Sequence, residues 1–212
     1  MQPSLTTRIR LSKYQSSAST ASGVEVVVDA AVDTDHLFDD LQWLIAASAP
    51  ESPPDFFVLH VREDCGEADY QRLAHAVATK QLAGKILLVV SVLRKPSDDV
   101  LSDLNSHGVR ILLGGIGVHA RFSDLIDHSI VGLVFDAGLV SDAAGNPQSA
   151  SILEAISALA LQLGLRTFAK CSRQLELDVA QSCGVDYLTL QGNIKSSPTS
   201  ALAPSLEDSS RL

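Results

Sequence analysis

The sequence predicts an α/β protein that forms a single (β/α)8 TIM-like barrel with short loops. Strand-like apolar segments alternate with helical patterns along its 212 residues. Several of these segments are continuous apolar runs, such as Ile86–Val90, and strands buried on both faces of a parallel sheet have this composition. An open, doubly wound sheet is the alternative that the same alternation allows.

Eight segments are expected to form the strands of the barrel. The first two are separated by a polar loop, Ser16–Gly23, which reads SSASTASG. In chain order, the expected strands are Arg8–Tyr14, Val24–Ala30, Phe56–Val61, Lys85–Ser91, Val109–Leu113, Val131–Asp136, Leu165–Ala169 and Asp186–Leu190.

Helical patterns fill the intervals between most of these strands. Ser97 suits a helix N-cap, because it follows Pro96 and precedes two aspartates that favour the first turn. The expected helices are Asp35–Ala49, Tyr70–Leu82, Ser97–Ser106, Ser149–Leu163 and Arg173–Cys183. The fourth is the clearest, because Gly164 ends it and its apolar residues form one stripe, which consists of Ile152, Ile156, Leu159 and Leu163.

Composition limits the class of protein. Hydrophobic residues make up 46% and charged residues 19%, which is typical of a folded globular chain. No apolar run approaches the ~18 residues that a membrane span needs, and no signal peptide is evident. The net charge of −9 argues against a broad nucleic-acid surface. Three cysteines without C-x-x-C spacing indicate reduced thiols in a cytoplasmic protein.

The chain is expected to divide into three parts. Residues 1–23 would supply the N-terminal strand and loop of the barrel, and residues 24–195 the rest of the barrel. Residues 196–212 are rich in Ser and Pro and are expected to form a flexible tail.

An ordered set of motifs occupies the second half of the chain. It comprises Gly108–Gly117 (GVRILLGGIG), Ile130–Asp136 (IVGLVFD), Leu163–Arg173 (LGLRTFAKCSR), Gln174-Leu175, Gly184–Tyr187 (GVDY) and Gln191-Gly192. In order and spacing this set resembles the second half of EAL domains, the bacterial cyclic di-GMP phosphodiesterase family. The corresponding family segments read G-V-R-I-A-L-D-D-F-G, V-D-Y-L-K-I-D and L-G-L-R-V-V-A-E-G-V-E. The resemblance implies a barrel of EAL type.

The resemblance also implies a metal site at the C-terminal mouth of the barrel. In active members, carboxylates and an Asn there hold Mg or Mn ions that activate water. Carried onto this chain, the glutamate of the E-A-L motif is Glu25, and Asp136 and Gln191 also match. Six other positions differ from the family. They are His60 in place of Asn, Val89 in place of Glu, Gly114 and Gly115 in place of two Asp, Val134 in place of Lys, and Lys170 in place of Glu.

These substitutions lead us to expect no catalytic residues, no bound metal and no cofactor. Hard divalent cations need several oxygen ligands, and the remaining carboxylates beside the Lys170 cation cannot supply them. The family's Arg that helps to hold the dinucleotide falls near Asp29, whose carboxylate would repel phosphate. We therefore do not expect tight binding of cyclic di-GMP.

Other interpretations of single residues stay open. The glycine turn Gly114–Gly117 could cradle a phosphate through its backbone amides, although a ligand-free tight turn is the simpler interpretation. His60 and His119 could form a soft-metal site with Glu25 and Asp136. Cys171 could be a reactive thiol, because it lies beside the Lys170 cation. Lys170 itself could form an ion pair with an acid such as Asp136 or Glu25.

The preferred functional hypothesis is a catalytically inactive EAL-like domain that acts through protein contacts in bacterial signalling. It implies a protein partner or a homodimer, with the dimer contact near the helix expected to start around His119–Leu125. A receptor that binds cyclic di-GMP without hydrolysing it is the second hypothesis. An active phosphodiesterase with a rebuilt site is the third.

Overall fold

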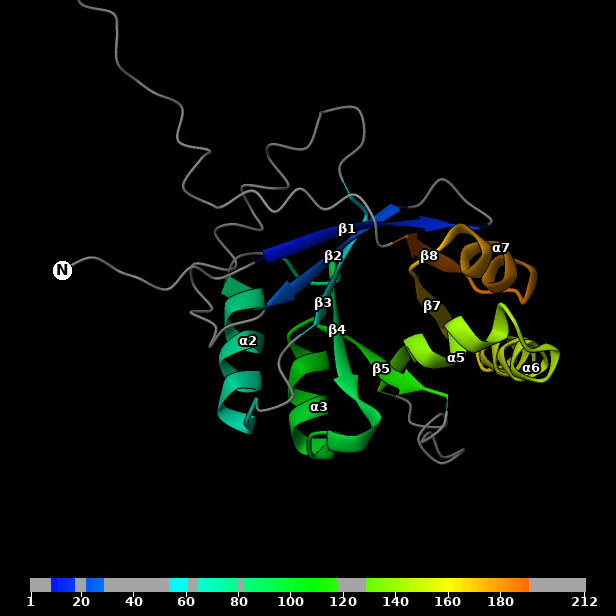
Figure 1. The fold of residues 1–212 in the computed structure, drawn as a ribbon. Helices are drawn as coiled ribbons and strands as arrows, with labels where there is room; N and C mark the ends of the chain where they lie inside the picture. The colour runs from blue at the N-terminus through cyan, green and yellow to red at the C-terminus, as the bar shows by residue number, and fades with distance from the viewer. Residues whose placement is uncertain are drawn as a thin grey trace, which may run out of the picture.

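The computed structural model describes residues 9–17, 22–28, 54–60, 65–79, 82–117 and 129–190. Within them, the strands pair in chain order and form a closed barrel, so the expected barrel is confirmed and the open sheet is excluded (Figure 1). The strands are β1 Ile9–Ser16, β2 Ser22–Val28, β3 Phe56–His60, β4 Ile86–Ser91, β5 Arg110–Ile116, β6 Ile130–Phe135, β7 Arg166–Cys171 and β8 Tyr187–Leu190.

Strand β1 departs from the all-parallel barrel that the sequence predicts. It pairs antiparallel with both β2 and β8, whereas β2 through β8 pair parallel. The connection from Ser16 to Ser22 is too short for a crossover, and a short connection can only join antiparallel neighbours.

The described helices surround the barrel. They are α2 Glu67–Thr79, α3 Asp98–Ser106, α5 Ala137–Ala143, α6 Pro147–Gln162 and α7 Gln174–Ser182. Helices α2 and α3 lie on one side of the barrel and α5, α6 and α7 on another (Figure 1). None of the helices in the described part is long and apolar enough to cross a bilayer. The helix expected over residues 35–49 and the tail expected over residues 196–212 lie outside the described residues.

Two details of these helices differ from the sequence prediction. Helix α5 was not predicted, although Asp136 marks its start by accepting a hydrogen bond from the backbone nitrogen of Gly138 at 2.8 Å. Ser97 does occupy the N-cap of α3, but its hydroxyl does not cap that helix. Instead, Ser97 Oγ donates a hydrogen bond to Glu67 Oε1 at 2.8 Å and so links α3 to the start of α2.

The apolar stripe expected on α6 is not its buried face. Ile152 is 50% exposed and Leu163 is 44% exposed, while Ile156 and Leu159 are only half-buried. The residues that face the barrel are Leu153, Ser157 and Ala160. A mixed face of this kind lets the helix approach the sheet closely, and hydrophobicity alone does not reveal it.

The hydrophobic residues form two cores that follow the period-two alternation of the strands. One core lies between the strands and the helices, and it includes Cys171, Leu188 and Leu133. The other fills the barrel, and its members are Tyr14, Phe56, Val58, Leu87, Leu112, Val134 and Phe168, with Val89, Val131 and Tyr187 packed against them. In that interior the rings of Phe168 and Tyr187 stack with centroids 4.8 Å apart.

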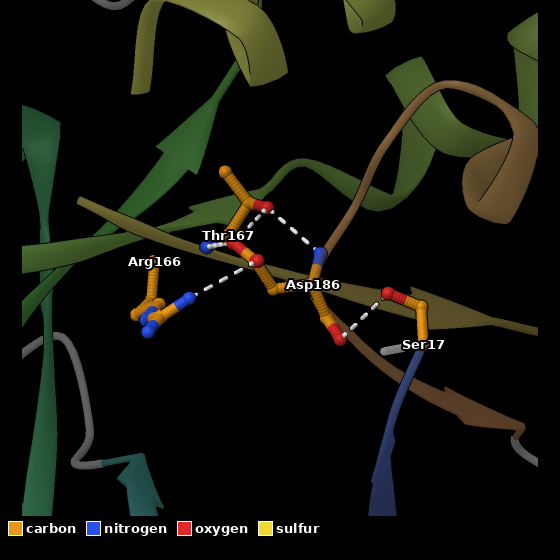
Figure 2. A network of polar contacts seen from close by, with 4 residues as sticks. All are labelled: Ser17, Arg166, Thr167 and Asp186. Atoms are coloured by element: carbon orange, nitrogen blue, oxygen red, sulfur yellow. Dashed lines mark hydrogen bonds and ion pairs between the residues drawn. The ribbon is translucent and has the colours of Figure 1, made fainter. Parts of the chain in front are cut away.

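A polar network joins β7, β8 and β1 at the N-terminal end of the parallel strands, which we call the barrel floor (Figure 2). Asp186 Oδ2 accepts hydrogen bonds from Thr167 N and Thr167 Oγ1, both at 2.9 Å, and Asp186 N donates to Thr167 Oγ1 at 2.9 Å. Ser17 N donates to the Asp186 carbonyl at 2.8 Å, and Ser17 Oγ donates to it at 3.2 Å. Arg166 Nη1 lies 3.5 Å from Asp186 Oδ1. Through Asp186 the network ties the antiparallel strand β1 to the parallel strands.

Candidate functional site

Polar side chains line the barrel interior near the C-terminal mouth. Side chains alternate between the two faces of a strand, so every second residue points into the barrel. Val58, Phe168 and Tyr187 belong to the interior, and the residues two positions after them therefore face the interior too. Those residues are His60, Lys170 and Thr189. Glu25 lies beside Val58 in the β2–β3 register and shares its face. This is the end of a barrel at which active sites of this fold are built.

Glu25 is the centre of this group, and its side chain is 1% exposed. Lys170 Nζ donates a hydrogen bond to Glu25 Oε1 at 3.0 Å. His60 Nε2 lies 3.0 Å from the same oxygen, although the ring N–H is not aligned for a hydrogen bond. The ion pair that the sequence suggested for Lys170 is therefore present, with Glu25 rather than Asp136 as the acid. In the closed barrel, β8 and β1 lie between β7, which carries Lys170, and β2, which carries Glu25, so the contact joins two strands that are not neighbours.

The environment of Glu25 favours its charged form. Burial raises the pKa of the carboxyl, but the His60 ring and the Lys170 ammonium lower it more, to about 2. Glu25 is thus a buried carboxylate that two basic side chains of the chain itself hold ionised.

Several buried polar atoms near Glu25 have no hydrogen-bond partner within the described residues. They are Glu25 Oε2, His60 Nε2, Thr189 Oγ1 and the hydroxyl of Tyr14. Burial is the main reason that the pKa of Tyr14 is raised well above its usual value, and the nearby Glu25 charge adds to it. Tyr14 pairs with Gly23 in the register and so lies one interior layer below Glu25. The Lys170–Thr189 pair places Thr189 beside the ion pair.

Sequence reasoning did not identify Tyr14 and Thr189 as site residues. The signal that could have found Thr189 is its position two residues after an interior aromatic residue, Tyr187. We call the contiguous set Lys170, Thr189, Tyr14, Glu25 and His60, from β7 through β8, β1 and β2 to β3, the polar arc.

The opposite side of the mouth, on β4, β5 and β6, carries Val89, Gly114 and Val134, which we call the apolar arc. A Cβ atom on Gly114 would lie 2.6 Å from Val89 Cγ1, which is far inside van der Waals contact. The Val89 side chain therefore fills the space that a side chain at position 114 would need.

The adjacent Gly115 has a backbone conformation that other residues rarely adopt. Its φ is +80°, in the left-handed region. The register of β5 against β6 shifts between Gly114 and Ile116, so Gly115 is the extra residue of a bulge. The glycines were expected in a turn after the strand, but β5 continues to Ile116. The prediction of a glycine turn was wrong, because the bulge absorbs the glycine pair within the strand.

The structure does not gather the remaining candidates around Glu25. Asp136 is exposed, and its carboxylate caps α5. Cys171 points away from the mouth into the core beneath the helices, and burial raises the pKa of its thiol to about 11, with the charge of Glu176 adding to the shift. The suggestion of a reactive thiol was therefore wrong. Gln191, His119 and Asp29 lie outside the described residues.

The donor set of the described mouth fits a divalent cation poorly. Such an ion needs several oxygen ligands, while the mouth offers one carboxylate, an imidazole and an ammonium. Across the described ranges, no three His, Cys, Asp or Glu side chains come together in a group that could hold a metal.

Comparison with known proteins relates this barrel to solved structures. The sequence matches no family model and no curated protein. The structure resembles Klebsiella pneumoniae BlrP1, solved as a calcium/cy-diGMP complex, with a TM-score of 0.70 and 16% identity over 90% of this chain and 55% of BlrP1. It also resembles the PaMucR phosphodiesterase, solved as a c-di-GMP complex, with a TM-score of 0.71 and 16% identity over 92% of this chain and 93% of that protein.

A third solved structure gives the same result. The EAL domain of Mycobacterium smegmatis DcpA aligns with a TM-score of 0.68 and 15% identity, over 85% of this chain and 88% of that domain. The chain therefore spans about half the length of BlrP1 but nearly all of PaMucR and of the DcpA domain. At these identities the likeness concerns the fold, and the fold of this chain is that of EAL domains.

Proposed function

We propose that this chain is a catalytically inactive EAL-like domain that acts as a protein-interaction or regulatory module in bacterial, cytoplasmic signalling by cyclic di-GMP. The observation that carries the proposal is the ion pair between Glu25 and Lys170 at the barrel mouth, with Nζ 3.0 Å from Oε1. Metal-assisted hydrolysis of a phosphodiester needs a cluster of anionic oxygens there. In this chain the Lys170 ammonium stands at one position where the resembled motif has a glutamate.

The apolar arc adds a second support. A side chain at position 114 would collide with Val89, and a side chain at position 115 would need a strained left-handed backbone. Both positions correspond to metal-binding aspartates in the motif that the sequence resembles. The described side of the barrel formed by β4 and β5 is thus packed for an apolar interior rather than for ion binding.

The test of inactivity is a hydrolysis assay with cyclic di-GMP in Mn²⁺ or Mg²⁺, with the PaMucR phosphodiesterase as a positive control. We expect the control to yield product and this chain to yield none above the protein-free blank. Product from this chain that disappears in a Glu25→Gln variant would contradict the proposal. Glu25→Gln keeps the shape of the side chain, so the comparison isolates the charge.

Exposed apolar side chains on α6 support a protein partner. Leu161 is 72% exposed, and on another side of the helix Ile152 and the C-cap residue Leu163 are about half exposed. We expect a partner captured from the host lysate to bind the wild type and the Glu25→Gln variant equally, and Leu161→Ser more weakly. Gln148→Ser, at an exposed position on a different side of α6 from Leu161, is the matched control. Capture that is lost with Glu25→Gln but kept with Leu161→Ser would contradict this part of the proposal.

A receptor for cyclic di-GMP is the second candidate. The observation that favours it is that Lys170 and His60 are about a quarter exposed at the mouth, where their basic groups could contact phosphate. Calorimetry with cyclic di-GMP, with and without Mg²⁺, separates the two candidates. The interaction module predicts no heat of binding. A receptor predicts saturable binding that Lys170→Met weakens.

A further inference from the structure

The barrel mouth contains a cation that belongs to the chain itself. Lys170 on β7 extends to Glu25 on β2, and its Nζ lies 3.0 Å from Oε1. Only one of the three ammonium donors is used for this hydrogen bond, and the side chain is 26% exposed. The ammonium is therefore held at the edge of the buried site, with its charge directed at the carboxylate.

Glu25 requires such a compensating charge. A carboxylate whose side chain is 1% exposed loses nearly all of its hydration, and this loss is costly unless an opposite charge and hydrogen bonds replace the water. Among the described residues, Lys170 and His60 are the basic groups within 4 Å of its oxygens. Lys170 donates a well-aligned hydrogen bond to Glu25, and His60 lies equally close to the same oxygen, so the two basic groups share the compensation of the carboxylate.

We propose that Lys170 is a resident cation that takes the place of a divalent metal beside Glu25 and keeps such an ion out of the barrel mouth. BlrP1, which shares the fold, was solved with calcium and with manganese. An ion bonded to Glu25 Oε1 would lie ~2.0–2.6 Å from that oxygen. The Lys170 ammonium already lies 3.0 Å from it, so the two cations would compete for the same oxygen and repel each other at close range.

Reversing the charge of Lys170 should therefore create a metal site. Lys170→Glu would remove the ammonium and add a second carboxylate beside Glu25 and His60. The mouth would then offer two carboxylates and an imidazole, which is a donor set that Mn²⁺ accepts. The inference deepens the proposed loss of metal chemistry but does not depend on a protein partner.

The experiment is a calorimetric titration of the full chain with Mn²⁺ alone. We expect the Lys170→Glu variant to bind one ion per chain at least tenfold more tightly than the wild type, and to lose this site when Glu25→Gln is added. Lys85→Glu makes the same change of charge at an exposed position and should behave like the wild type. A wild type that binds Mn²⁺ as tightly as Lys170→Glu, or a folded Lys170→Glu that binds none, would overturn the inference.

A double-mutant cycle decides the question if Lys170→Glu does not fold. Lys170→Met should raise the equilibrium constant of unfolding at least tenfold, and the addition of Glu25→Gln should restore most of it. A double variant that is no more stable than Lys170→Met would overturn the inference. Hydrolysis of cyclic di-GMP by the wild type would instead overturn the proposed function, so the two failures can be distinguished.

Discussion

The two ends of the β7–β8–β1 wall differ in how far their polar groups are satisfied by hydrogen bonds. At the floor, both carboxylate oxygens, the amide and the carbonyl of Asp186 have partners from neighbouring strands. At the mouth, Glu25 Oε2, Thr189 Oγ1 and the Tyr14 hydroxyl have none within the described residues. In a barrel of this kind the floor serves stability and the mouth serves function. The comparison shows that the polar groups of Asp186 are satisfied within the described residues, whereas those of the mouth leave hydrogen-bonding capacity unused there.

Loss of the counter-charge at the mouth should have the largest effect. Lys170→Met leaves the buried Glu25 with His60 as its remaining basic neighbour among the described residues, and removal of one partner of a buried ion pair costs about 3–5 kcal/mol. Urea denaturation measures the change, with Lys85→Met as the exposed control, for which we expect less than about 0.5 kcal/mol. A small effect of Lys170→Met would mean that the ion pair contributes no more than an exposed one.

The pH dependence of stability tests the same pair without a change at Lys170. The folded state lowers the pKa of Glu25 from 4.5 to about 2, so the ionised carboxylate stabilises the fold above pH 4.5. This contribution, about 3 kcal/mol, should be lost as the pH falls through the window from 4.5 to about 2. Glu25→Gln should remove that part of the acid destabilisation. An unchanged acid profile in Glu25→Gln would contradict the assignment.

At the floor, Asp186→Ala should destabilise the protein by about 2 kcal/mol. The substitution removes Asp186 Oδ2, which accepts from both the Thr167 amide and the Thr167 hydroxyl, and an unsatisfied buried donor costs ~1–3 kcal/mol. Hydrogen exchange of the Thr167 amide should accelerate together with the loss of stability. Asp142→Ala, at an exposed position on α5, is the control and should change neither. An Asp186→Ala protein as stable as this control would mean that the floor network is not structural.

The smallest effect is expected at Gly115, next to the apolar arc. Gly115→Ala forces a side chain into a left-handed backbone with φ of +80°, which costs ~1–2 kcal/mol. Gly145→Ala, where an added Cβ meets nothing within 4 Å and φ is ordinary, should change the melting temperature little. Equal melting temperatures for the two variants would show that the bulge in β5 relaxes freely.

The sequence was sufficient for the barrel because its strands are apolar runs whose order and spacing can be recognised independently of the site residues. All eight expected strands overlap observed ones, yet the antiparallel β1 was missed, since its direction depends on the shortness of one connection. The buried face of α6 was predicted wrongly, because the helix buries the small residues Ser157 and Ala160 while the larger Ile152 is half exposed. The Glu25–Lys170 pair was only one of two options in the sequence, because partners 145 positions apart are joined by barrel closure alone. Thr189 and Tyr14 carry no motif, so only strand parity could have placed them.

The bulge at Gly115 and the overlap at Gly114 have an evolutionary consequence. A mutation that restored an acidic residue at either position would first be penalised, at Gly114 by collision with Val89 and at Gly115 by backbone strain. Either substitution is therefore expected to survive only after a compensating change, such as a smaller residue in place of Val89 or loss of the bulge in β5. The order in which such mutations can accumulate is constrained by the packing of β4 against β5.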